Sequence, residues 1–101
     1  MRAVVWSQRA RAEFDSYLHW VAERSPTAAA RIGEEVVAWV ERLATHPESG
    51  HPSFRWPGFR KHSLPARSNF VLYEVAEDRI QIAAFRDGRQ DNRNLRLKPP
   101  K

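Results

Sequence analysis

Two short runs hold the side chains that could do chemistry: Arg60, Lys61 and His62 in mid-chain, and Arg86 and Arg89 near the end. Metal-free cleavage of an RNA backbone needs a general base, a general acid and cations beside the phosphate. His62 is a candidate acid or base, with Arg60 and Arg86 as the cations. Because side chains alternate along a strand, Arg60 and His62 would share one face and Lys61 the other. A solvated, charged edge strand explains the same residues without catalysis, and we favour it.

The histidines do not form a metal-binding pattern. The spacing of His19, His46, His51 and His62 matches neither a metalloprotease pair nor a zinc finger, and the chain has no cysteine. The sequence likewise has no glycine-rich phosphate-binding loop and no serine nucleophile elbow. We therefore expect no metal and no cofactor.

Aromatic and basic side chains alternate in residues 54–61. Such a run could form a surface on which nucleobases stack. It could also close the end of a hydrophobic core with Trp56 and Phe59 while the cations stay in water. We favour the second interpretation, because a chain of 101 residues has few large apolar side chains to spare.

The positive charge is concentrated in the last part of the chain. Residues 79–101 contain seven Lys and Arg and two Asp, which gives +5; residues 1–50 contain six Arg and seven acids, which gives −1; residues 51–78 contain four and three, which gives +1. Charge placed in this way attracts an anionic partner, either an acidic protein surface or nucleic-acid phosphate.

The composition is typical of a globular domain. The chain is 42% hydrophobic and 29% charged, with no apolar run near the ~20 residues that cross a bilayer. The first residues lack the apolar stretch of a signal peptide. We expect a cytoplasmic protein without a membrane partner.

The spacing of apolar residues predicts a strand followed by two helices. Residues 3–6 are short, apolar and β-branched, and Ser7 is a candidate N-cap for the first helix. Ser25 and Pro26 end that helix and cap the next, which runs to about residue 46. The apolar stripes are Ala10, Phe14, Tyr17, Leu18 and Val21 on the first helix, and Ala29, Ile32, Val36, Val40 and Leu43 on the second.

After a loop over residues 47–58, three strands are expected at residues 59–64, 70–75 and 79–85. The result is an α+β fold with the order β-α-α-β-β-β, in which a helical hairpin packs on one face of a small, mostly antiparallel sheet. We expect the other face to lack a covering layer. Residues 1–91 would form a single domain, and residues 92–101 a basic, flexible C-terminal tail.

Several short motifs follow one another along nearly the full length of the chain. They are Val5-Trp6-Ser7, Ser25-Pro26 with Ala28-Ala29-Ala30-Arg31, Leu43, Pro47, Gly50, Gly58-Phe59-Arg60, the strand over residues 70–75 and Gly88-Arg89-Gln90 after the last strand. Their order and spacing resemble the RelE/ParE toxin superfamily of type II toxin–antitoxin modules, and Gly88-Arg89-Gln90 is similar to the ParE-like branch.

The resemblance implies the same fold and a cognate acidic antitoxin whose C-terminal segment wraps the toxin. ParE-like toxins poison DNA gyrase, whereas RelE-like toxins cleave messenger RNA on the ribosome. The catalytic Tyr or His that RelE-type enzymes place near the C-terminus is missing after Asp91. We therefore expect a growth-arresting toxin that binds gyrase and is not an enzyme. The alternatives are a ribosome-dependent, metal-independent mRNA endoribonuclease that uses Arg60, His62 and Arg86, and a small nucleic-acid-binding module.

Two sets of residues are candidates for binding. The target-binding set is Arg60, Arg86, Arg89 and Gln90. The antitoxin would bind an apolar groove between the two helices, and the residues expected to contact it are Phe14, Leu18, Val36, Val40 and Arg79.

Overall fold

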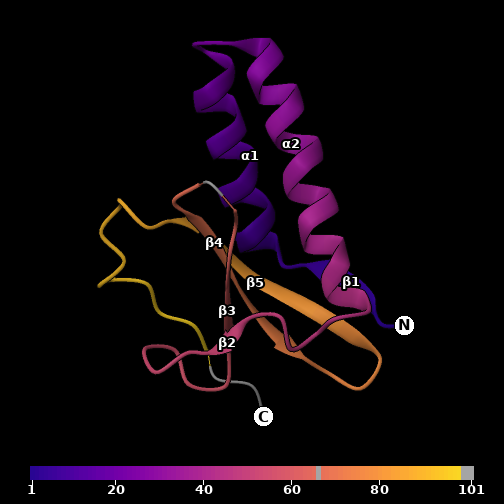
Figure 1. Cartoon of the computed structure of the whole chain (residues 1–101). Coiled ribbons are helices and arrows are strands. Elements are labelled where there is room, and N and C mark those ends of the chain that lie inside the picture. The colour runs from indigo at the N-terminus through magenta and orange to yellow at the C-terminus, as the bar shows by residue number, and fades with distance from the viewer. Residues whose placement is uncertain (66, 99–101) are drawn as a thin grey trace.

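The computed structural model describes residues 1–65 and 67–98. The two α-helices lie side by side and pack against a mixed sheet (Figure 1). The elements are β1 (Ala3–Trp6), α1 (Gln8–Ala22), α2 (Pro26–Glu41), the short 3-10 helix η1 (Arg42–Ala44), β2 (His51–Pro52), β3 (Arg60–Ser63), β4 (Asn69–Val75) and β5 (Arg79–Asp87).

Both predicted helix caps are confirmed. The Ser7 hydroxyl accepts a hydrogen bond from the Ala10 backbone N–H at 3.0 Å, and the Ser25 hydroxyl accepts one from Ala28 at 3.1 Å. Pro26 occupies the first turn of α2, where its missing N–H costs no hydrogen bond. Two of the orphan amides at the helix starts are thereby satisfied, which fixes where each helix begins.

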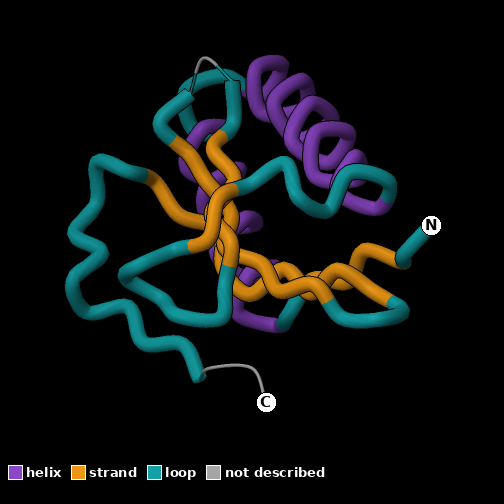
Figure 2. The backbone as a smooth tube through the Cα atoms, turned by 60° about the horizontal axis from the view of Figure 1, so that its bottom comes forward, coloured by secondary structure: helices purple, strands orange, loops and turns teal. Residues whose placement is uncertain are grey.

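The sheet has the order β1-β5-β4-β3-β2, with β1 parallel to β5 and the other pairs antiparallel. The predicted α+β fold and element order are confirmed. Strand β2, which falls inside the expected loop, was missed because two residues carry no alternating pattern; it pairs with β3 through His51 and Lys61. Figure 2 shows the strands passing in front of one helix, with the other helix to one side.

The main core lies between the helices and the sheet. Its fully buried members include Val36 and Val40 from α2 and Tyr73, Ile80 and Ile82 from the sheet. The aromatic rings of α1 extend this core toward the end of β5, as the Phe14–Phe85 centroid distance of 5.1 Å shows. This core fixes α1 on the sheet.

The expectation that the second sheet face lacks a covering layer was wrong. Trp56, Phe59 and Leu95 cover Phe70 and Leu72 there as a second buried cluster. The Trp56 Nε1–H donates to the Leu95 carbonyl at 3.1 Å, and both views show the segment after β5 running back past the loop that precedes β3 (Figures 1 and 2). The core-closing interpretation of residues 54–61 holds for the two buried aromatics, whereas Phe54 is fully exposed. The segment expected to be a flexible tail thus contributes a buried side chain, and residues 99–101 lie outside the described range.

Candidate binding site

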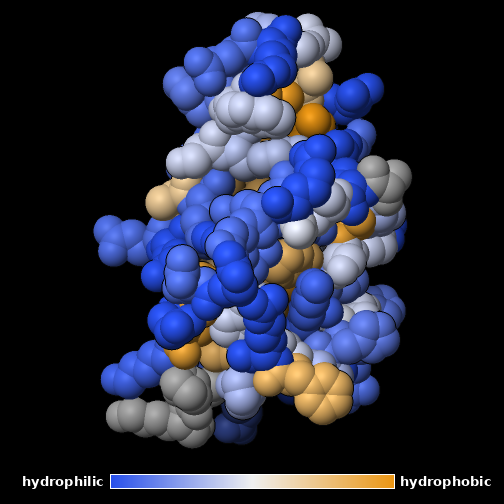
Figure 3. Space-filling view, turned by 90° about the vertical axis from the view of Figure 1, so that its left-hand side faces the viewer, coloured by the Kyte–Doolittle hydropathy of each residue, from blue (hydrophilic) through white to orange (hydrophobic). Residues whose placement is uncertain are grey.

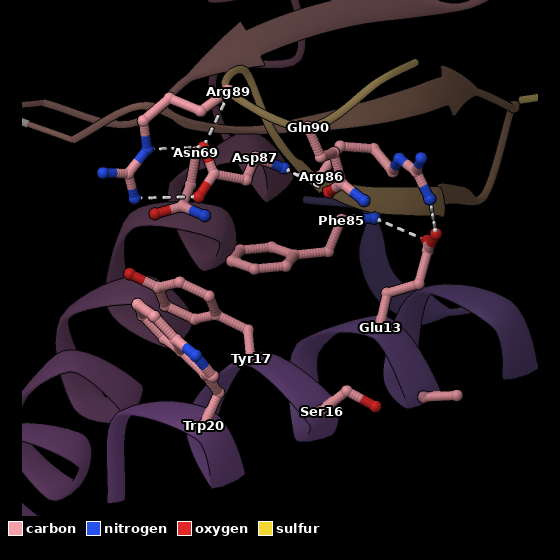
Figure 4. Close-up of a pocket in the computed structure, with 11 residues that line it drawn as sticks. Glu13, Ser16, Tyr17, Trp20, Asn69, Phe85, Arg86, Asp87, Arg89 and Gln90 are labelled. Atoms are coloured by element: carbon pink, nitrogen blue, oxygen red, sulfur yellow. Dashed lines mark hydrogen bonds and ion pairs between the residues drawn. The ribbon is translucent and has the colours of Figure 1, made fainter. Parts of the chain in front are cut away.

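An open cavity of about 720 Å³ lies between α1 and the end of β5 (Figure 4). It contains three of the four residues predicted to bind a target: Arg86, Arg89 and Gln90. The full lining is Ala12, Glu13, Ser16, Tyr17, Trp20, Asn69, Phe85, Arg86, Asp87, Arg89 and Gln90. We call this cavity the α1–β5 pocket.

Aromatic rings form the floor of the α1–β5 pocket. The ring centroid of Tyr17 lies 5.6 Å from that of Phe85 and 6.2 Å from that of Trp20. Tyr17 and Trp20 are three residues apart on α1, so helix geometry places them on the same side. The guanidinium of Arg24 lies 4.2 Å from the Trp20 ring centroid, a cation–π distance.

Glu13 of α1 is hydrogen-bonded to the end of β5, which forms the opposite wall of the pocket. Its carboxylate accepts from Arg86 Nη1 at 2.6 Å and from the Phe85 backbone N–H at 3.1 Å. Arg86 also donates from Nε to Asn92 Oδ1 at 2.8 Å. With its side chain only 14% exposed, Arg86 is a structural ion-pair residue in this structure, and its charge is already compensated.

The turn after β5 is held by Asp87. The carboxylate accepts from the backbone N–H and the guanidinium of Arg89 and from the Ser68 hydroxyl, and these hydrogen bonds, the guanidinium's first, lower the pKa of Asp87 far below its usual range. Gln90 Oε1 accepts from the Asp87 backbone N–H at 2.8 Å. Arg89 is bound to Asp87 yet remains largely exposed at the rim.

Asn69 is the unusual residue of the pocket. The residue is only 2% exposed, and its Nδ2 has no hydrogen-bond partner among the described residues. Leaving a buried donor unpaired costs roughly 1–3 kcal/mol, so such groups are rare in folded proteins. In Figure 4 the amide lies above the ring of Phe85, across the pocket from Tyr17. No sequence pattern singled out Asn69, whereas the Tyr17–Trp20 spacing was a signal that could have been used.

Arg60, the fourth predicted target-binding residue, lies elsewhere. It pairs in the sheet with Tyr73, three positions along β4 from the Phe70–Arg86 pair. Its guanidinium donates to the Gly50 carbonyl at 2.8 and 3.1 Å. A Cβ on Gly50 would lie 2.6 Å from the Lys61 carbonyl, so the chain can come this close to β3 only because residue 50 is a glycine. Arg60 therefore holds the loop before β2 in place.

His62 is buried rather than solvated. It stacks on Trp39 of α2 with ring centroids 5.0 Å apart, and burial, with the nearby His51, lowers the pKa of His62. The predicted alternation is confirmed, because Lys61 Nζ lies on the other face, 4.4 Å from the Phe70 ring centroid. The solvated-edge interpretation is thus wrong for His62, which is buried, and for the position of β3, because β2 lies outside it in the sheet. Only the exposure of Lys61 agrees with it. Of the three residues of the nuclease hypothesis, Arg60 and His62 share one face of β3, whereas Arg86 lies on β5 and is paired with Glu13.

An apolar groove lies between α1 and α2, as predicted, but only two of the five residues predicted to contact the antitoxin line it. Phe14 and Leu18 line it, whereas Val36 and Val40 are fully buried in the main core and offer no surface to a partner. Arg79 stands at the start of β5, paired with Asp78 at 3.3 Å, away from the groove. The full lining, which includes residues that the stripe analysis missed, is Phe14, Leu18, Ala29, Ala30, Gly33, Glu34, Val37 and Ala38.

The comparison with known families decides the identity. The family model described as the ParE toxin of the type II toxin–antitoxin system parDE matches residues 4–92. This chain belongs to the ParE toxin family. A solved structure, the chromosomal ParDE toxin–antitoxin system from P. aeruginosa, is similar with 26% sequence identity and a TM-score of 0.75, over 86% of this chain and 96% of that chain. The search of curated proteins found no match.

Membership in the ParE family confirms the resemblance seen in the sequence and implies an antitoxin partner. Within residues 1–65 and 67–98, neither helix has the length and apolar character needed to cross a membrane, and His, Asp and Glu side chains form no group of three that could hold a metal.

The basic C-terminal part of this ParE-family chain is largely paired. Arg79, Arg86, Arg89 and Arg93 each contact a carboxylate, Arg93 through Asp91 at 3.0 Å. On the face that carries α1 and the segment after β5, hydrophilic side chains surround small hydrophobic patches (Figure 3). The charge predicted to bind a partner is thus offset locally, and a partner must be recognised by shape and hydrogen bonding as well.

Proposed function

We propose that this ParE-family toxin arrests growth by binding DNA gyrase and that a cognate acidic antitoxin neutralises it. The observation that supports a binding mechanism is that each candidate nuclease residue already has a contact within the protein. Arg60 donates to the Gly50 carbonyl, Arg86 pairs with Glu13, and His62 is buried in a stack with Trp39. Two of the three cations and bases needed for cleavage are thus engaged and the third is largely buried, which supports binding over hydrolysis.

The groove between α1 and α2 is the best site for the antitoxin. Its surface is almost entirely apolar, and Val37 on its rim is 43% exposed. A Cβ at Gly33 would lie 3.4 Å from Leu18 Cδ1, an ordinary van der Waals contact, so α2 and the Leu18 side chain of α1 lie close together in the groove. The apolar face of an amphipathic helix fits such a groove. The formal charge of +5 favours approach of an acidic partner.

The target is tested in growing cells. Expression of the chain should stop growth, relax a reporter plasmid and leave transcripts uncut, because loss of gyrase activity removes negative supercoils without touching RNA. Co-expression of the cognate acidic antitoxin should restore growth. Transcripts cut within reading frames, with the plasmid still supercoiled, would mean that the toxin is a nuclease.

The antitoxin site is tested with a matched pair of variants. Val37→Glu places a charge in the groove, whereas Val75→Glu places one at a valine of similar exposure, 40%, at the end of β4 and outside the groove. We expect Val37→Glu to be toxic and no longer neutralised, and Val75→Glu to be neutralised normally. Equal neutralisation of both variants would place the antitoxin elsewhere.

A further inference from the structure

The α1–β5 pocket and the helix groove lie on different sides of α1. Successive residues of a helix are about 100° apart, so Ser16, in the pocket, and Leu18, in the groove, are separated by about 200°. A helix bound in the groove therefore leaves the pocket's own side of α1 uncovered. The molecule can hold two partners, or two parts of one, at separate places.

The buried amide of Asn69 indicates that the pocket receives a ligand. Its Nδ2 has no partner among the described residues, and Figure 4 shows the amide at the pocket wall above the aromatic floor. A hydrogen-bond acceptor from a bound molecule would satisfy this donor. The other buried donor without a partner among the described residues, Trp39 Nε1, lies outside the pocket, so it is the position of Asn69 in the pocket lining that points to a ligand.

The charge balance of the pocket indicates which ligand. Glu13 is paired with Arg86, and Asp87 with Arg89, so the four charges of the lining cancel. A phosphate would need a free cation, and Arg86 is already bonded on two sides. An aromatic floor with a neutral rim suits an apolar side chain, and a neighbouring backbone carbonyl would supply the acceptor.

We propose that the α1–β5 pocket is the place where this toxin holds its protein target. The pocket takes an aromatic or aliphatic side chain of the target, and a carbonyl oxygen beside that side chain accepts a hydrogen bond from Asn69 Nδ2. This inference rests on the proposed function, in that the toxin acts by binding a protein, and it names the surface that does so.

The first test is Asn69→Leu, which keeps the branched shape of the side chain, with methyl groups in place of the amide oxygen and nitrogen, and removes the donor. Because the donor is unpaired in the free protein, the midpoint of thermal unfolding should stay the same or rise. The dose of toxin needed to halve the growth rate should rise at least tenfold, as expected when a central contact of an interface is lost. A lower unfolding midpoint with unchanged toxicity would mean that Asn69 has a structural role, and would overturn the proposal.

The second test fills the pocket from the exposed side of α1 without touching the core. Ser16→Trp places a large ring at the pocket mouth, and Asp15→Trp places the same ring on the same helix outside both the pocket and the groove. We expect Ser16→Trp to be folded, to bind the antitoxin and to be at least tenfold less toxic, while Asp15→Trp is as toxic as the natural chain. Full toxicity of folded Ser16→Trp would also overturn the proposal.

The same series separates this inference from the proposed function. If the natural chain stops growth but leaves purified gyrase active, the gyrase proposal fails, and the effect of the variants on growth still decides the pocket. If the natural chain does not stop growth, both proposals fail. If the natural chain binds a 20-nucleotide single strand or duplex and Ser16→Trp weakens that binding, the ligand is nucleic acid and the protein-target proposal is overturned.

Discussion

Glu13 is the side chain on which the α1–β5 pocket depends most. One carboxylate oxygen accepts from Arg86 at 2.6 Å and the other from the Phe85 backbone N–H at 3.1 Å, so a single residue of α1 fixes both the backbone and a side chain of β5. Both ion-pair side chains are more than four-fifths buried. We expect Glu13→Ala to weaken the fold and open the pocket.

The size of the effect follows from these two hydrogen bonds. Loss of a charge-assisted hydrogen bond to Arg86 costs about 1.5–3 kcal/mol, and the orphaned Phe85 N–H costs about 1–3 kcal/mol more. Both side chains keep some contact with water and the structure can relax around the substitution, so we expect the total loss of unfolding free energy near the lower end of this range, about 3 kcal/mol. In a domain of this size, each kcal/mol lowers the midpoint of thermal unfolding by about 4–8 °C, so the expected fall is about 12–24 °C.

Urea denaturation measures this directly, with Asp15→Ala as the control on the exposed side of the same helix. The control should change the free energy of unfolding by no more than about 0.5 kcal/mol. A double-mutant cycle with Arg86→Met should give a coupling energy of at least about 1 kcal/mol between Glu13 and Arg86. A loss for Glu13→Ala no larger than the control's, or zero coupling, would refute the argument.

Three further outcomes are expected. Tyr73→Phe leaves the buried Gly50 N–H and the partly buried Pro47 carbonyl, both in the loop before β2, without their partner, so urea denaturation should show a loss of about 2–4 kcal/mol. Burial lowers the pKa of His62, so as the pH falls the unfolded state binds a proton at this residue at a higher pH than the folded state does. The free energy of unfolding should therefore fall as the pH drops below about 6.5, and His62→Phe should remove this dependence on pH. The pKa of Asp87 is lowered mainly by its hydrogen bond from Arg89, so the stability it gives is present above about pH 4 and is lost in stronger acid; an acid denaturation curve unchanged by Asp87→Asn would contradict this.

The local elements of the fold could be read from the sequence because they depend on neighbours in the chain. Ser7 and Ser25 cap the helices through amides three residues away. The alternation of β3 placed His62 and Lys61 on opposite faces, as observed. Element order then left few topologies to choose from.

The site depended on contacts that no local pattern carries. Arg86 is paired with Glu13, 73 positions away, and the sequence gives no reason to connect these two residues. Leu95 covers the second sheet face through a polar segment that had no apolar period. The apolar stripe of α2 correctly predicted that Val36 is buried, but the residues that line the groove, such as Val37, lie beside the stripe.

The most direct test of a toxin that acts by binding is made with purified components. The chain is titrated into DNA gyrase acting on relaxed plasmid with ATP, and the supercoiled product is measured. Supercoiling should fall as the toxin concentration rises and return when the antitoxin is added. Unchanged supercoiling with the toxin in excess over gyrase would contradict it.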